Sequence, residues 1–338
     1  MAWDMIGHQW VVDHLRHQLQ LGGVRQAYLF TGPDAVGKET VALRLAQALL
    51  CQTGRIDPCG ACDACRKVAA SAHPDLHLVE AEEVDGTLKV DQIRELQRQI
   101  ALSPYAGGRR VVLIRRAHEL SIGAGNALLK TLEEPPPQVV LMLAARSLES
   151  LRATIVSRCE VMALRPVDAG TIGQALTAEF GAERAHLLAS LSAGRPGLAI
   201  ALGRDEQALT VRRQSLDGLF EAMQAPYTTR FAYVKELMPG RDRSLDRRRC
   251  LDELETWLSL WRDIMLASHG AQVPAANIDE VSRIVRIGQA IKPSVASDTV
   301  GALQSALVAV SRNANLQLAM ETALLDLPRL SGALVSAE

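Results

Sequence analysis

AYLFTGPDAVGKET, residues 27–40, is the stretch that decides the fold of this chain. A short apolar run leads into a glycine-rich turn, after which apolar residues recur at helical spacing, so the predicted order is strand, loop, helix. The turn has the form G-x-x-x-x-G-K and contains Gly32, Gly37 and Lys38. In a phosphate-binding loop, such glycines let backbone N–H groups surround phosphate oxygens, and the lysine reaches the terminal phosphates. A glycine-rich turn that binds nothing is the alternative interpretation.

The residue that follows the lysine departs from this motif. A Ser or Thr hydroxyl normally binds Mg²⁺ at that place, whereas the chain has Glu39, and Thr40 comes one residue late. A nucleotide hydrolase also ends a second buried strand with metal-binding acids, but the apolar run at residues 111–114 is followed by Arg115 and Arg116. Two arginines repel Mg²⁺, although they attract phosphate or a neighbouring subunit's acids, or simply lie in solvent. We therefore expect a degenerate loop in which binding of ATP or ADP stays open and hydrolysis is lost.

Four of the six cysteines lie within fifteen residues: Cys51, Cys59, Cys62 and Cys65. Their spacing, C-x7-C-x2-C-x2-C, lets successive thiolates turn back onto one ion, and four thiolates suit tetrahedral Zn²⁺. With four protein ligands no open position remains, so we expect a structural zinc site. A redox-active pair and an iron–sulfur cluster are the alternatives.

Further apolar runs have the length of buried strands: residues 76–80, 111–114 and 139–143. Helical patterns lie between them, as a parallel sheet with crossover helices requires. We therefore expect an α/β domain over residues 1–165. Strand-like runs largely disappear after it, which predicts a small helical domain over residues 166–207. Residues 208–338 keep a helical pattern, with an apolar stripe along residues 251–265, and are expected to form an all-helical domain.

Composition narrows the classes of function. The 338 residues include 37 basic and 38 acidic side chains, a formal net charge of −1, so no global field attracts nucleic acid. The first ten residues lack the pattern of a secretory signal. No apolar run approaches the ~18 residues that a membrane span needs. We expect a cytoplasmic protein with reduced thiols and no membrane partner.

Several motifs, in this order, resemble the clamp-loader branch of the AAA+ ATPases: Ile6-Gly7-His8, the phosphate loop, the four cysteines, His73-Pro74-Asp75, NALLKTLEEPP at residues 126–136 and Ser157-Arg158-Cys159. The resemblance implies an AAA+ P-loop α/β domain with a parallel sheet and a zinc-binding insertion, then a small helical lid and an all-α collar for oligomerisation. It also implies a ring-like pentamer with motor subunits of the gamma or tau kind and a delta subunit. Such a ring uses ATP to place a sliding clamp on primed DNA.

Within that family, the departures of this chain favour a stator over a motor. Besides Glu39 and Arg115, the polar residue that motors place after the next strand is Ala145 here, and the arginine of the small domain occurs only at a shifted place, Arg195. Arg158 alone predicts either an ordinary ion pair or an arginine finger, and the resemblance assigns it the catalytic role of a finger for a neighbouring motor subunit. The alternatives are an active motor, in which another group replaces the missing metal ligand, and a zinc-dependent nucleic-acid-binding module. Neutral charge and an aromatic content of 4% disfavour the last.

Overall fold

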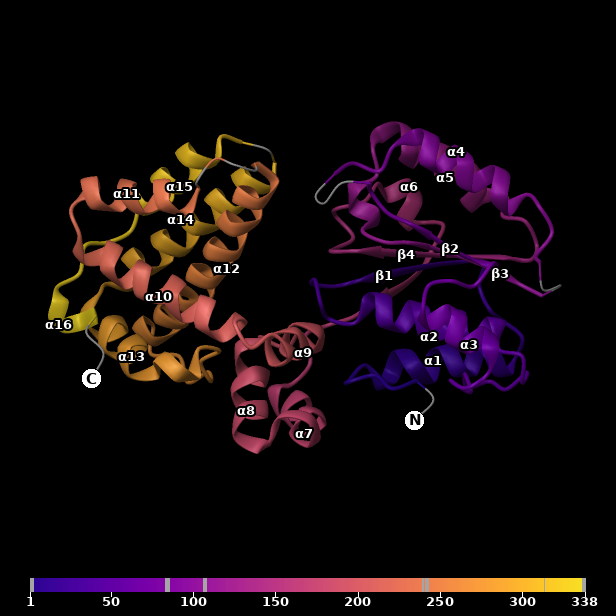
Figure 1. Cartoon of the computed structure of the whole chain (residues 1–338), viewed down its shortest axis with the longest axis horizontal. Coiled ribbons are helices and arrows are strands. Elements are labelled where there is room, and N and C mark those ends of the chain that lie inside the picture. The colour runs from indigo at the N-terminus through magenta and orange to yellow at the C-terminus, as the bar shows by residue number, and fades with distance from the viewer. Residues whose placement is uncertain are drawn as a thin grey trace. The chain divides into compact units, whose positions relative to one another are not determined.

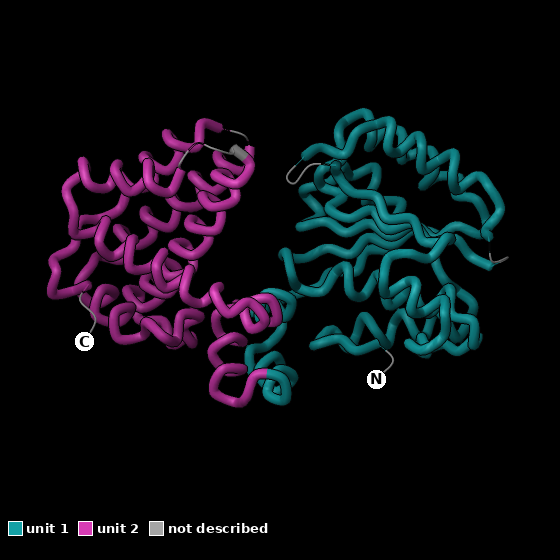
Figure 2. The backbone as a smooth tube through the Cα atoms, viewed as in Figure 1, with its two compact units in different colours: residues 1–179, 194–199 teal, residues 180–193, 200–338 magenta. Residues whose placement is uncertain are grey.

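The computed structural model describes residues 3–82, 86–105, 108–238, 240, 243–312 and 314–335. The chain divides into two compact units (Figure 2), one made of Met1–Glu179 with Gly194–Ala199 and the other of Phe180–Ala193 with Ile200–Glu338. This division is coarser than the three predicted domains, whose boundaries remain predictions. Residues 1–2, 83–85, 106–107, 239, 241–242, 313 and 336–338 of the predicted domains lie outside the described residues. No helix in the described ranges is both long and apolar enough to cross a membrane.

The first unit is built on a sheet of five strands: β1 (Ala27–Thr31), β2 (Leu76–Val79), β3 (Arg110–Ile114), β4 (Val139–Ala145) and β5 (Glu160–Ala163). Their order across the sheet is β2-β3-β4-β1-β5, and every neighbouring pair is parallel. The predicted parallel sheet is therefore confirmed. Because parallel strands end at the same edge, the loops after β1, β3 and β4 meet there, where ligands bind in open α/β sheets.

Helices cover both faces of this sheet (Figure 1). On one face lie α1 (Gln9–Gln20), α2 (Lys38–Leu50) and α3 (Asp63–Ala69), and on the other α4 (Val90–Ile100), α5 (Ile122–Glu133) and α6 (Ala153–Val156). Strand side chains alternate between two cores: Tyr28 and Phe30 of β1 pack with the first set of helices, and Leu29 packs with the second. Burial on both faces explains why these strands are continuous apolar runs in the sequence.

The secondary-structure elements described in the second unit are all helices: α8 (Ala182–Leu191), α10 (Ala208–Gln224), α11 (Tyr227–Leu237), α12 (Arg243–Ser268), η2 (Ile278–Glu280), α13 (Val281–Ala290), α14 (Pro293–Ser311), α15 (Leu316–Leu325) and α16 (Gly332–Val335). Helix α12 is central to its core, because α13 and α14 both pack against it. Trp257 and Trp261, on the predicted apolar stripe, are fully buried there. Helices α7 (Ala169–Phe180) and α9 (Pro196–Arg204) contain residues of both units.

A buried arginine donates hydrogen bonds to backbone carbonyls at the end of α15 in the second unit. Arg230 is 1% exposed, and its Nη1 donates to the carbonyls of Leu324, at 2.6 Å, and Leu327, at 2.9 Å. These carbonyls lie at or beyond the last turn of a helix, where no intrahelical donor is left for them. We expect Arg230→Met to lower the free energy of unfolding by about 2–4 kcal/mol, because the carbonyls stay buried without donors. Lys235→Met, which changes an exposed residue on the same helix, should keep a free energy of unfolding near that of the wild type in urea. Equal stability of the two variants would contradict this role.

Candidate functional site

The phosphate loop connects β1 to α2 at the carboxyl edge of the sheet. Two of its glycines have backbone angles that favour glycine, with φ of 145° at Gly32 and 116° at Gly37. A Cβ added to Gly32 would also lie 2.3 Å from the carbonyl oxygen of Leu164. The loop therefore requires glycine at the first motif position for reasons of space as well as conformation.

Lys38 begins α2 and is only 8% exposed. Its Nζ donates to the carbonyls of Gly32, at 2.6 Å, and Pro33, at 2.7 Å, and lies 3.6 Å from a carboxylate oxygen of Asp34. Burial lowers the pKa of the Lys38 ammonium group. The lysine thus lies inside the curve of the loop, where the motif predicts it.

Two other segments of the first unit hold the loop in this shape. His8 donates from Nε2 to the carbonyl of Val36 at 2.9 Å, and burial lowers the pKa of His8. The N–H of Gly197 donates to the carbonyl of Ala35 at 2.9 Å. A Cβ on Gly197 would meet that same oxygen at 2.8 Å, so the two backbones approach closely. Hydrogen bonds from both segments therefore fix the backbone of the loop.

The positions that share Mg²⁺ in a hydrolase are joined here by an ion pair. Glu39 Oε2 lies 3.2 Å from Nε of Arg115, and Arg115 Nη1 lies 3.3 Å from Glu80 Oε2, just after β2. Thr40, the late hydroxyl, is exposed. Nothing in this arrangement supplies the hydroxyl and strand-end acid that coordinate Mg²⁺ in P-loop hydrolases. The departures noted in the sequence therefore lie side by side in the structure.

His118 lies close to this edge, in η1 (Ala117–Glu119). Burial, followed by the positive charge of Arg146, lowers its pKa from 6.5 to about 4. Between these two values the unfolded chain binds the proton and the folded one does not, so stability is lost as the pH falls. We expect His118→Asn to remove that loss, which amounts to at most about 2 kcal/mol between pH 7 and pH 5. Urea unfolding at pH 7 and pH 5 would measure it, with the exposed His186→Asn as control. An unchanged difference between the two pH values would contradict the assignment.

The four cysteines come together from separate segments, since Cys51 follows α2, Cys62 caps α3, Cys65 lies within α3 and Cys59 lies in the loop between the helices. Their four Sγ atoms all lie within 4.8 Å of one another, with Cys51–Cys62 and Cys59–Cys65 separations of 3.9 Å. Thiolates ~2.3 Å from one tetrahedral zinc ion are about 3.8 Å apart. The N–H of Cys62 donates to Cys59 Sγ at 3.3 Å, and that of Cys65 to Cys62 Sγ at 3.4 Å. The donor set therefore fits a single tetrahedral metal ion.

Side-chain contacts tie the cysteine module to the helices below it. Asp57 accepts hydrogen bonds from Trp3 Nε1, at 2.8 Å, and from Nε of Arg16, at 2.6 Å. The hydrogen bond from Arg16 is the main reason that the pKa of Asp57 lies below its usual value. In α2, Gln47 donates to the carbonyl of Cys65 at 2.9 Å. The module is thus anchored to α1 and to the helix that carries the phosphate loop at its other end.

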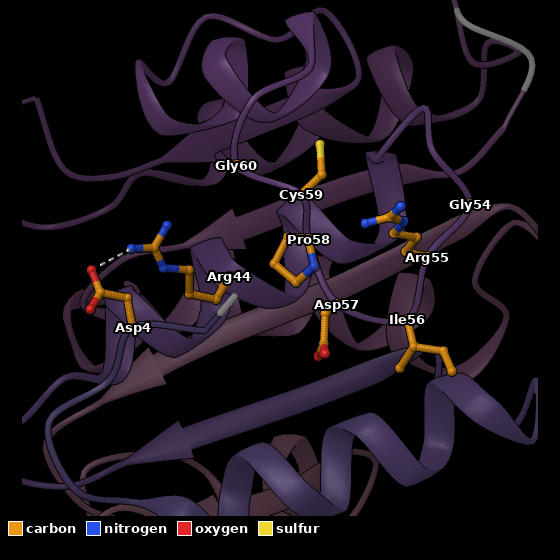
Figure 3. Close-up of a pocket in the computed structure, with 9 residues that line it drawn as sticks. All are labelled: Asp4, Arg44, Gly54, Arg55, Ile56, Asp57, Pro58, Cys59 and Gly60. Atoms are coloured by element: carbon orange, nitrogen blue, oxygen red, sulfur yellow. Dashed lines mark ion pairs between the residues drawn. The ribbon is translucent and has the colours of Figure 1, made fainter. Parts of the chain in front are cut away.

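An open cavity of about 750 Å³ lies beside this module (Figure 3). Charged side chains of both signs line it, and Arg44 pairs with Asp4 at 3.6 Å across one side. Since the charges of its walls largely cancel, the cavity does not select an anion or a cation.

Arg158 lies just after α6, at the surface of the first unit. Its Nη2 donates to Oε1 of Glu133, at the end of α5, at 2.5 Å. Its Nη1 donates to the carbonyl of Thr154 at 2.9 Å. The Arg158 side chain is still 34% exposed. The guanidinium group is therefore held at the surface by groups of its own chain, as the ion-pair interpretation requires, and it remains accessible.

The sequence interpretation missed the partners of these cations. Glu39 and Arg115 were each recognised as departures from the motif, but their pairing was not predicted. One signal was present: the two positions that normally share a cation carry opposite charges. Arg146, after β4, donates from Nε to Oδ2 of Asp34 in the loop at 2.7 Å, and nothing in the sequence indicated that contact.

A parallel P-loop sheet with a four-cysteine insertion gives the first unit an AAA+-type α/β fold. The sequence model of the family described as DNA polymerase III, delta subunit, matches residues 7–168. The delta' subunit of Escherichia coli DNA polymerase III is 32% identical over 284 residues, which cover 81% of this chain and 80% of that protein. This chain belongs to the family of DNA polymerase III delta' subunits, and the predicted place in the clamp-loader branch is confirmed.

Other relatives match over shorter regions. The tau subunit of Salmonella typhimurium is 37% identical over 212 residues, covering 61% of this chain and 33% of that protein. This chain spans less than half the length of several curated relatives that it matches. Among solved structures, a gamma subunit-related protein of Thermotoga maritima matches with 16% identity and a TM-score of 0.44, over 93% of this chain and 97% of that one.

Proposed function

We propose that this chain is the stator of a clamp loader, a subunit that supports ATP hydrolysis by its neighbours and performs none itself. Its partners would be motor subunits of the gamma or tau kind and a delta subunit, and through them a sliding clamp and primed DNA in the cytoplasm. The observation that carries this proposal is the Glu39–Arg115 ion pair, at 3.2 Å, which joins the two positions that a hydrolase uses for Mg²⁺.

Arg158 supplies the chain's contribution to catalysis in this proposal. An arginine finger must reach a neighbour's γ-phosphate, so its guanidinium has to be accessible and already oriented. The hydrogen bonds from Arg158 to Glu133 and to the Thr154 carbonyl restrict its conformations, while a third of the side chain stays exposed. This combination supports a finger that is presented at the surface before assembly.

The metal in this proposal is zinc with a structural role. The four thiolates leave no coordination position for a substrate, which is the arrangement of structural zinc sites. Bound zinc would hold the loop between α2 and α3 and thereby the C-terminal end of α2.

Reconstituted clamp loading tests the proposal. Motor subunits, delta subunit, fluorescently labelled clamp, primed DNA and ATP would be combined with and without this chain, and clamp transferred to DNA would be measured. We expect loading to depend on the chain and to persist with Arg98→Ala, a change of an exposed arginine in α4. Full loading without the chain would contradict the proposal.

A further inference from the structure

We propose that the phosphate loop is a metal-independent site for a nucleoside di- or triphosphate, in which the guanidinium group of Arg115 takes the place of Mg²⁺. The inference rests on the proposed function in one respect, the loss of hydrolysis by this chain. It assigns a ligand class and a mode of binding to the phosphate loop, to which the stator role gives no function.

The cation position is filled by the chain itself. Arg115 leaves the end of β3, where a hydrolase has its metal-binding acid, and lies between two carboxylates. It contacts Glu39, at 3.2 Å, and Glu80, at 3.3 Å. Its side chain is 24% exposed, whereas those of Glu39 and Glu80 are 45% and 50% exposed, so the Arg115 side chain is the most buried of the three. A divalent ion binding between these carboxylates would have to displace a covalently attached cation.

A guanidinium group can carry out the part of the metal's work that concerns binding. It is always charged, and its donors match phosphate oxygens. Nη1 of Arg115 donates to Glu80 at 3.3 Å, whereas Nε, 3.2 Å from Glu39 Oε2, has no hydrogen-bond partner among the described residues. It cannot hold a water molecule or a phosphoryl oxygen in octahedral coordination as Mg²⁺ does. Binding without turnover is the expected consequence.

The loop retains the groups that bind phosphate. In the described part of the chain, the N–H groups of Asp34, Ala35 and Lys38 donate to no protein acceptor. Ala35 has a φ of 61°, in the left-handed region that lets successive N–H groups of a phosphate loop turn inward. Lys38 is nearly buried and held inside the curve. The loop donors adjoin Arg115 through Glu39, the second residue of α2, which pairs with it.

Nucleotide binding by the isolated chain in EDTA and in Mg²⁺ tests the inference, with fluorescent ADP and ATP analogues as probes. We expect the wild-type chain to bind nucleotide with affinities that agree within about twofold in the two conditions, because Arg115 rather than Mg²⁺ supplies the positive charge. A twofold change in affinity is a small difference in binding free energy. Arg115→Ser should weaken binding in EDTA at least tenfold. Mg²⁺ should restore much of this loss, because Glu39 and Glu80 are then free to hold the ion. Arg116→Ser, a change of the adjacent arginine, which pairs with Glu119 instead, should keep the wild-type behaviour.

A second variant keeps the inference testable if Arg115→Ser fails to fold, which thermal unfolding would reveal. The double change Glu39→Thr with Arg115→Asp restores a hydroxyl and a strand-end acid, and should bind Mn²⁺ together with nucleotide in electron paramagnetic resonance. Wild-type binding that requires Mg²⁺, or no binding of either nucleotide in both conditions, would overturn the inference. Neither result would affect the clamp-loading test, and failure of clamp loading with metal-independent nucleotide binding intact would overturn the stator role alone.

Discussion

Arg158→Ala is expected to leave assembly intact and to remove most ATP turnover at the neighbouring site that Arg158 completes. An arginine finger contributes on the order of 10³-fold or more to the rate of phosphoryl transfer, because it stabilises charge that develops in the transition state. The Arg158 guanidinium contacts only Glu133, the Thr154 carbonyl and Ser157 among the described residues, so its loss should not unfold the chain. DNA-stimulated ATP turnover of the assembled loader would measure the effect, and size-exclusion chromatography would check assembly.

Two further variants separate a finger from a surface ion pair. Arg98→Ala removes an arginine that also pairs with one carboxylate of its own chain, Glu95 at 2.8 Å, and should leave turnover unchanged. Glu133→Gln removes the charged partner that orients Arg158, and should cause a smaller loss that disappears in the Arg158→Ala background. Unchanged turnover of the assembled Arg158→Ala loader would exclude the finger role.

Loss of one ligand of the proposed zinc site is expected to have the largest effect on stability. Cys65→Ala removes a thiolate that is fully buried in α3, and we expect the chain to lose its zinc and about 3–5 kcal/mol of stability. The reason is that the remaining thiolates lose the ion that compensates their proximity, which leaves the hydrogen bonds of Asp57 and Gln47 to hold the module. Plasma mass spectrometry would give zinc per chain, and thermal unfolding with and without a chelator would give the stability.

Cys159→Ala is the matched control for this prediction. It removes one sulfur, a partly buried one, and burial raises the pKa of the Cys159 thiol to about 12, as expected for a packed thiol outside the cluster. This variant should keep one zinc ion per chain and respond to chelator like the wild type. Equal zinc content and equal stability of the two variants would contradict a structural metal site at Cys65.

The sequence predicted the sheet well because its strands are buried on both faces. Residues 27–30 and 111–114 were expected as strands, and β1 and β3 each extend them by a single residue. The strand expected at residues 139–143 continues through two alanines, Ala144 and Ala145, whose small side chains carry little strand preference. The cysteine cluster was predictable because metal ligation imposes a short, specific spacing.

Contacts between distant segments were not predictable in the same way. Asp57 bonds to Arg16 and Trp3, yet neither spacing nor composition marks these three as neighbours. The same holds for Arg158 and Glu133, which meet because α5 and α6 lie on the same face of the sheet. Single-sequence reasoning identifies a charged residue as unusual, but only the folded arrangement shows which opposite charge lies beside it.

The most direct test of the stator role is Mg²⁺-dependent ATP hydrolysis, measured first on the purified chain alone and then after addition of motor subunits, delta subunit, clamp and primed DNA. The account predicts no turnover by the chain alone, because Arg115 lies where the metal site would be, and turnover in the mixture that requires the chain. Robust turnover by the chain alone would contradict the account and identify the protein as a motor.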